Sequence, residues 1–242
     1  MHMELKTPAS EPHFIVAHDL ALATVRIKAY EHVNLDLASN QAHALCAEHK
    51  SGKTELLLTL AGRMHRTHGD LRIADIDASN LRGVDRVRRI SGLGFFDNVN
   101  DVERVLRVRT VTSAELGLAG RRSGRAETRE YLDQWGLGEV AESNIEELTS
   151  YDYHRLGIAL GMAQAPRVLV VHDIERDLTR EQSLTLADEL CRLARERNVT
   201  IVCGVTDSDL ATRFDSATRL VSANHERQAG NQRKGALGRK VA

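Results

Sequence analysis

Eight consecutive residues have the composition of a phosphate-binding loop. They lie between a short apolar strand pattern and a helical pattern, and they read Ala47-Glu48-His49-Lys50-Ser51-Gly52-Lys53-Thr54. Backbone N–H groups at a helix N-terminus bind phosphate, and a lysine that follows the glycine can reach the β- and γ-phosphates of a nucleotide. We therefore expect Lys53 to contact phosphate, the Thr54 hydroxyl to ligate Mg²⁺, and Gly52 to let the backbone come close.

The match to the pattern GxxxxGK[ST] is incomplete. Ala47 stands at the first glycine, where it costs backbone freedom, and His49 and Lys50 are bulkier than the usual small residues. Lys50 would add positive charge near phosphate. The alternative is a strand, a turn and a helix with a chance Gly-Lys-Thr. We favour nucleotide binding, through Ala47, Lys50, Ser51, Gly52, Lys53 and Thr54.

Strand and helix patterns surround this loop. Strand patterns occur at 14–16, 33–37, 43–46, 71–73, 168–171 and 200–203, and helical patterns at 54–62, 126–135 and 180–197. Residues 168–171 form a continuous apolar run, which is typical of a parallel strand buried on both faces. The order strand, helix, strand from 168 to 203 indicates a right-handed parallel crossover. The sequence therefore predicts an α/β fold with a mostly parallel central sheet.

Composition limits the other possibilities. The chain has 242 residues and a formal net charge of −1, which suits one large α/β domain and gives no electrostatic case for a nucleic-acid partner. Cys46, Cys191 and Cys203 lie in apolar runs without metal-ligand spacing, which favours a reduced, cytoplasmic compartment. No apolar run approaches the ~20 residues that span a bilayer, so a role at a membrane requires another chain.

From about residue 14 to 224, the order of segments resembles an ABC-type transporter ATP-binding subunit. Residues 56–62 resemble the family's LLxxLAG stretch. Residues 166–173 fall where the second nucleotide motif belongs, which is four apolar residues followed by Asp-Glu. Residues 200–206 resemble the strand that ends in the switch histidine. Residues 147–155 are similar to the signature motif LSGGQxxR with its run-in. The signature-like positions are Leu148, Thr149, Ser150, Tyr151 and Asp152.

The resemblance implies a P-loop NTPase core with an N-terminal antiparallel β subdomain and a helical subdomain that carries the signature motif. It implies ATP and Mg²⁺ as cofactors, membrane-spanning permease chains as partners, and a second nucleotide-binding subunit in a homo- or heterodimer. The chain would then lie at the inner face of the cell membrane, held by its permease.

We expect a flexible N-terminus at 1–12, the nucleotide-binding domain at 13–225 with its helical subdomain at about 96–165, and a basic disordered tail at 226–242. Residues 117–125, rich in Gly and Arg, are expected to form a mobile loop.

The second nucleotide motif departs from the family pattern. His172 stands at the Mg²⁺-directing Asp, and Asp173 stands at the catalytic Glu with a side chain one methylene shorter. A general base must reach its water at hydrogen-bond distance, so Asp173 is a weak catalytic candidate. It is also, with Thr54, a tentative Mg²⁺ ligand. One alternative shifts the register by one residue, which makes Asp173 the metal ligand and Glu175 the base. His172 could itself be a metal ligand, but a lone histidine beside a strand end is more often hydrogen-bonded locally.

Further departures affect other parts of the site. Asp207 at the switch histidine would repel the γ-phosphate, although it could serve as a helix N-cap. Phe95 replaces the expected glutamine, and Thr24 falls where an aromatic side chain would stack on adenine. Ser150 and Tyr151 replace the signature glycines. Tyr151 is too large to let this loop lie against a nucleotide across a dimer interface. The alternative is that Tyr151 is an ordinary packing residue.

These losses predict weak nucleotide binding with slow or no hydrolysis, because each lost charge or base commonly costs ~10²-fold in rate. A catalytically inactive regulatory or scaffold protein of the same fold is the alternative. A different phosphate-loop enzyme, such as a small-molecule kinase, is disfavoured by the signature-like segment upstream of 168–171.

Overall fold

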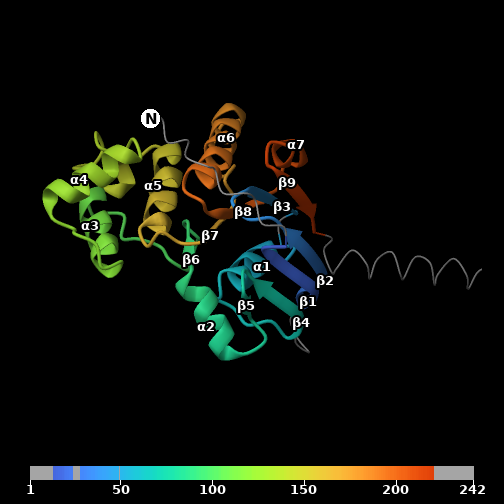
Figure 1. The fold of residues 1–242 in the computed structure, drawn as a ribbon. Coiled ribbons are helices and arrows are strands. Elements are labelled where there is room, and N and C mark those ends of the chain that lie inside the picture. The colour runs from blue at the N-terminus through green and yellow to red at the C-terminus, as the bar shows by residue number, and fades with distance from the viewer. Residues whose placement is uncertain (1–12, 24–27, 49, 221–242) are drawn as a thin grey trace, which may run out of the picture.

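The computed structural model of the chain describes residues 13–23, 28–48 and 50–220 (Figure 1). Thr24, His49, the predicted flexible N-terminus and the predicted basic tail lie outside the described residues. The strands are β1 Ile15–Ala23, β2 Lys28–Leu37, β3 Ala42–Cys46, β4 His68–Ile73, β5 Ile76–Asp77, β6 Ser91–Leu93, β7 Val168–Val171, β8 Thr200–Val205 and β9 Ser216–Arg219. The helices are α1 Lys53–Leu60, α2 Leu81–Arg89, α3 Val108–Leu118, α4 Arg125–Gln134, the 3₁₀ helix Ile145–Glu147, α5 Ser150–Met162, α6 Arg180–Glu196 and α7 Ser208–Ala211.

The strands form two sheets. Strands β2, β1, β4 and β5 pair in that order, all antiparallel, and β6, β7, β8, β3 and β9 pair in that order, all parallel. Because parallel strands all point the same way, the loops after β3, β7 and β8 leave one edge of the second sheet together. This common edge brings together three segments that are far apart in the sequence, at 50–54, 172–177 and 206–207.

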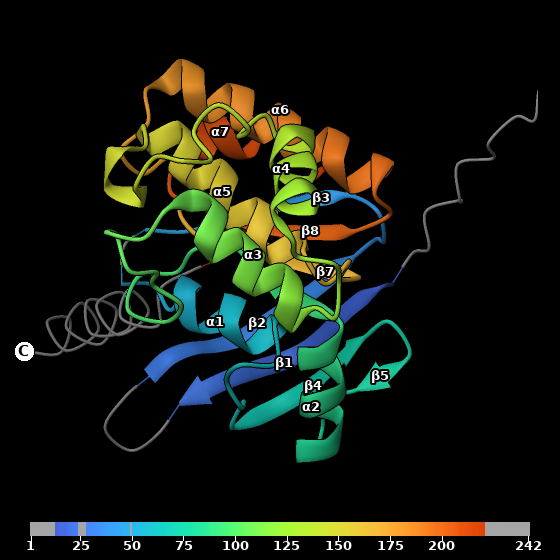
Figure 2. The same cartoon turned by 90° about the vertical axis from the view of Figure 1, so that its left-hand side faces the viewer.

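Helix α1 lies between the two sheets (Figure 2). Its Leu56, Leu57 and Leu60 are fully buried in a core shared with the antiparallel sheet and with Val168 and Val170 of β7. The alternate residues of β7 enter a second core under α6 and α7, on the opposite face of the parallel sheet. Burial on both faces explains the continuous apolar run at 168–171. Strand β7 therefore holds the segment that follows it rigidly.

A third core holds the helical subdomain, formed by α3, α4 and α5 at the left of Figure 1. Leu132 and Leu156 are fully buried there, and the Tyr131 hydroxyl donates a 2.6 Å hydrogen bond to the carbonyl of Ala159. Residues 117–118 belong to α3 and residue 125 begins α4, so the loop predicted at 117–125 is confined to residues 119–124. Within the predicted helical subdomain, most of 98–107 is not helical.

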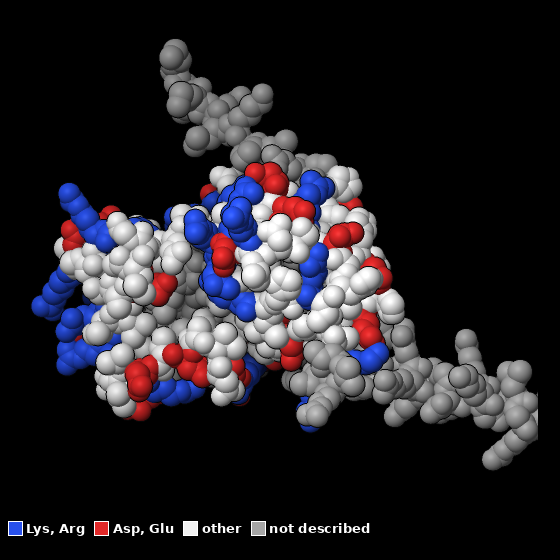
Figure 3. Space-filling model, turned by 90° about the horizontal axis from the view of Figure 1, so that it is seen from below, with Lys and Arg blue, Asp and Glu red and all other residues white. Residues whose placement is uncertain are grey.

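Basic and acidic side chains are interspersed over the face seen in Figure 3, and basic ones gather toward the edge where the helical subdomain lies. In the helical subdomain three arginines form ion pairs with one carboxylate: Arg107, Arg109 and Arg125 converge on Glu142. In the described part of the chain, none of the helices is long and apolar enough to cross a membrane.

Candidate functional site

The phosphate-loop pattern lies where β3 meets α1. Gly52 is the N-cap of α1 and has a φ of 84°, and Lys50 also has a positive φ of 62°. A helix start leaves its first N–H groups without partners inside the helix, and these groups attract anions. The amide of Ala47 donates to the carbonyl of Val205 at 3.0 Å, which ties the beginning of the loop to β8. The predicted loop therefore lies at a helix start, as the sequence pattern indicated.

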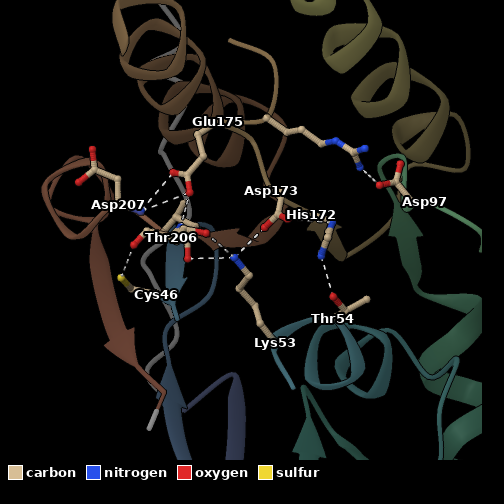
Figure 4. Close-up of polar contacts among 11 residues, drawn as sticks. Cys46, Lys53, Thr54, Asp97, His172, Asp173, Glu175, Thr206 and Asp207 are labelled. Atoms are coloured by element: carbon tan, nitrogen blue, oxygen red, sulfur yellow. Dashed lines mark hydrogen bonds and ion pairs between the residues drawn. The ribbon is translucent and has the colours of Figure 1, made fainter. Parts of the chain in front are cut away.

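Lys53 points into the protein and is 4% exposed (Figure 4). Its ammonium donates to the carbonyl of Val205 and to the hydroxyl of Thr206, both at 3.1 Å, and its Nζ lies 2.6 Å from Oδ1 of Asp173. The Asp173 side chain is 14% exposed, so this ion pair is largely shielded from water. A nucleotide that uses Lys53 must therefore compete with Asp173.

The Thr54 hydroxyl faces His172 and not Asp173. Its Oγ1 lies 2.7 Å from Nε2 of His172. The imidazole also packs on the buried ring of Phe96, with ring centroids 5.1 Å apart, and its Nδ1 is 3.7 Å from Oδ2 of Asp173. This arrangement supports the register with His172 at the Mg²⁺-directing position. His172 thus hydrogen-bonds a neighbouring side chain, although that residue lies 118 positions away in the sequence.

Glu175 is engaged away from Lys53 and Thr54. Its Oε1 accepts hydrogen bonds from the backbone amides of Thr206 and Asp207, the latter at 3.2 Å. The carboxylate thus holds the loop after β8 in place, which disfavours Glu175 as a general base. Asp173 itself has a φ of 39°, an uncommon conformation that Asp tolerates better than most residues.

Asp207 caps a helix. Its carboxylate accepts from the amide of Asp209 at 2.8 Å at the start of α7, and Nη1 of Arg180 lies 3.5 Å from its other oxygen. The N-cap interpretation of Asp207 therefore agrees with the structure. A carboxylate held in this way replaces the imidazole that the family resemblance places there, and it would repel a phosphate.

The signature-like segment begins helix α5. Thr149 is its N-cap and accepts from the amide of Asp152 at 3.1 Å. Tyr151 packs against the second core, with the guanidinium of Arg155 5.8 Å from its ring centroid. Ser150 lines a cavity of about 130 Å³ that reaches His172 and Asp173 at the end of β7. The packing interpretation of Tyr151 thus accounts for its aromatic ring.

Several contacts around this cavity were not predicted. The ring of Phe95 stacks on Tyr153 at 4.5 Å, so the expected glutamine is replaced by a residue that packs on α5. Arg176 forms an ion pair with Asp97, and its carbonyl lies 2.9 Å from Nε2 of His154. Burial lowers the pKa of His154. These contacts join segments distant in sequence, and no local pattern marks them.

The donor atoms near Thr54 do not fit Mg²⁺. This ion takes oxygen ligands at about 2.0–2.1 Å, in a nearly octahedral arrangement, whereas imidazole nitrogen suits zinc, copper, iron or nickel. The atom facing the Thr54 hydroxyl is a nitrogen of His172, and the nearby Asp173 carboxylate is paired with Lys53. Among the described residues, no group of three or more His, Cys, Asp and Glu side chains gathers to hold a metal ion.

Substitution of Gly52 tests how tightly the loop is held. A Cβ at this position would overlap the carbonyl of Ala29, and the positive φ disfavours any L side chain. We expect Gly52→Ala to lower the free energy of unfolding by more than about 2 kcal/mol. Gly120→Ala is the matched control, because Gly120 has a φ of 69° but open space around it. Equal losses of stability in urea unfolding would contradict the close approach.

Comparison with known proteins identifies a family and several relatives of this chain. The family model described as ABC transporter matches residues 30–173, more than half of the chain. The chain is 27% identical over 213 residues to the phosphate-import ATP-binding protein PhnC of Mycolicibacterium smegmatis, covering 84% of this chain and 81% of that protein. It is 26% identical over 201 residues to the phosphonates import ATP-binding protein PhnC 1 of Rhodopseudomonas palustris, covering 77% and 70%.

Solved structures show the same fold. The cbiO1 protein of Clostridium perfringens, part of the ABC transporter complex cbiONQ, superimposes with a TM-score of 0.72 at 18% identity, covering 96% of both chains. The dimeric bacterial ABC transporter cassette MJ0796 superimposes with a TM-score of 0.72 at 19% identity, covering 85% of this chain and 94% of that one. Because the family model matches more than half of the chain and the relatives are ATP-binding proteins, the chain belongs to the ABC transporter family of ATP-binding proteins.

Proposed function

We propose that this chain binds ATP at residues 47–54, couples to membrane-spanning permease chains, and hydrolyses ATP slowly or not at all. The observation that carries the proposal is Lys53: it lies at the start of α1, where phosphate would bind, but its ammonium is paired with Asp173. The loop can therefore accept a triphosphate once that ion pair opens. The relatives named for phosphate and phosphonate import favour an oxyanion as the transported substrate.

Weak hydrolysis follows from the groups around the phosphate loop. A base must draw a proton from water, and charges must stabilise the transition state. Here Asp173 is tied to Lys53, Glu175 holds the loop after β8, and Asp207 caps α7. None of these three carboxylates is placed to act freely as a base. This chain therefore retains ATP binding and has little or no ATP hydrolysis under the proposal.

A groove between the core and the helical subdomain supports coupling to a permease. It has a volume of about 340 Å³ and is lined by residues of β6, α3 and α5, among them Leu93, Val111 and Leu160. Exposed apolar side chains occur in the same part of the chain: Val99 lines the groove and is 47% exposed, and Val105, Leu106 and Leu118 are exposed outside its lining. Exposed apolar surface of this kind favours a protein partner.

ATP binding and turnover by the purified chain, alone and with its permease, test this function. We expect isothermal titration to show ATP binding that Lys53→Met weakens at least ~30-fold, because the substitution removes the buried ammonium. Lys50→Met is the matched control, since Lys50 is exposed and should contribute only weak surface attraction. Turnover is expected to stay at background with or without the permease.

Each part of the proposal has its own contrary result. Turnover well above background that requires Lys53 would refute weak hydrolysis. ATP binding that Lys53→Met leaves intact would refute the phosphate loop. ATP binding by a chain that associates with no permease would favour the regulatory or scaffold protein instead.

A further inference from the structure

We propose that this site binds ATP without Mg²⁺, and that the imidazole of His172 takes the place of the metal beside Thr54. This inference rests on the proposed function, because it concerns how the same loop holds its nucleotide. The observation behind it is the hydrogen-bond distance of 2.7 Å between Thr54 Oγ1 and His172 Nε2. The hydroxyl that the sequence assigned to Mg²⁺ is therefore already engaged by a side chain.

A carboxylate and an imidazole behave differently beside a phosphate. A carboxylate next to a triphosphate needs a cation between the two anions, since like charges at short range repel. An imidazole can donate a hydrogen bond to a phosphate oxygen directly, in its neutral or its charged form. Replacement of the expected Asp by His172 therefore removes a protein ligand of the metal, and it also removes a negative charge that the metal would shield from the phosphates.

The imidazole is held in its position. Its ring packs on Phe96, which is 1% exposed, with the two ring planes tilted by 33°. Hydrogen bonding to Thr54 at one nitrogen and packing on Phe96 fix the ring at the end of β7, a strand buried on both faces. A side chain fixed in advance loses little entropy when a ligand binds. His172 is thus preorganised beside the start of α1, where an anion would replace the Thr54 hydroxyl as the partner of Nε2.

The remaining charges suit a free triphosphate. The start of α1 and Lys53 supply positive potential, and Lys50 lies at the rim of the same turn. The Asp173 carboxylate is paired with Lys53, and the ammonium of Lys53 balances its negative charge. The Asp173 carboxylate, which lies close to His172, is therefore already neutralised, so a divalent cation placed beside Thr54 would gain little from it beyond the phosphate oxygens that the cation holds in solution.

Titration of ATP in buffer with EDTA and in buffer with excess Mg²⁺ tests the inference. We expect wild-type chain to bind ATP at least as tightly in EDTA as in Mg²⁺. His172→Asp is expected to bind at least tenfold more weakly in EDTA than in Mg²⁺, because it restores a carboxylate beside the phosphates. His172→Asn is the matched control: it is uncharged, keeps a polar atom for Thr54, and should remain independent of Mg²⁺.

The outcomes separate this inference from the proposed function. Wild-type binding that falls tenfold or more in EDTA would overturn Mg²⁺ independence and leave ATP binding standing. Absence of binding in both buffers would overturn the ATP-binding function together with the inference. The wild-type comparison decides the matter by itself if His172→Asp fails to fold.

Discussion

Asp173→Asn is expected to raise the affinity for ATP about tenfold, which corresponds to about 1.4 kcal/mol. In the free chain the Lys53 ammonium is held 2.6 Å from Asp173 Oδ1, so a phosphate must displace the carboxylate before it gains Lys53. Asparagine removes that competition and also removes a negative charge beside the triphosphate. The gain should therefore appear in ATP binding and not in hydrolysis.

The same substitution should make the free chain less stable. It leaves a buried ammonium without its counterion, although Lys53 keeps its contacts to Val205 and Thr206. We expect a loss of about 1–3 kcal/mol in the free energy of unfolding. ATP supplies a new anion, so the ATP-induced rise in Tm should be larger in Asp173→Asn than in the wild type.

Asp177→Asn is the matched control for these measurements. Asp173 and Asp177 lie on the same segment after β7 and both have a positive φ, 39° and 56°, which Asn tolerates. The Asp177 side chain is 76% exposed and does not face Lys53. An equal gain in ATP affinity for both variants would show a general charge effect and contradict competition within the ion pair.

The main elements could be predicted because their patterns are local. The continuous apolar run at 168–171 predicted a strand buried on both faces, and the helical pattern at 180–197 predicted α6 almost to its ends. Strand β1 was predicted only at 14–16, although it extends to residue 23. Register shifts after Ala17 and a positive φ at Asp19 interrupt its alternation, so the period-two pattern disappears there.

The site could be predicted as a neighbourhood and not as a set of contacts. The segments after β3, β7 and β8 must meet at one edge of a parallel sheet. This placement predicts that Lys53, Asp173 and Thr206 lie near each other. Which atoms pair depends on side-chain directions fixed by packing, such as His172 against Phe96. Spacing in the sequence therefore indicated a nucleotide site, whereas the Lys53–Asp173 pair required the structure.

The triple variant His172→Asp, Asp173→Glu, Asp207→His restores the side chains that the family pattern has at these positions. We expect it to raise ATP turnover about 10²-fold above the wild type. The first substitution returns a carboxylate to Thr54, the second lengthens the acid by one methylene, and the third replaces a repelling charge. Groups that act as a unit are strongly non-additive, so each single substitution should give little turnover. Asp207→His also removes the cap of α7, at a cost of about 1 kcal/mol.

Turnover should be measured with Mg²⁺ and with EDTA, after far-ultraviolet circular dichroism has shown that the variant is folded. The gain should vanish in EDTA, because the restored carboxylate needs the metal, and it should vanish when Lys53→Met is added. Tyr151 is left unchanged because it packs against the second core, and this limits the gain. A folded variant that binds ATP with Mg²⁺ but stays at background turnover would contradict the prediction, because the loss would then lie in the signature-like segment at Ser150 and Tyr151.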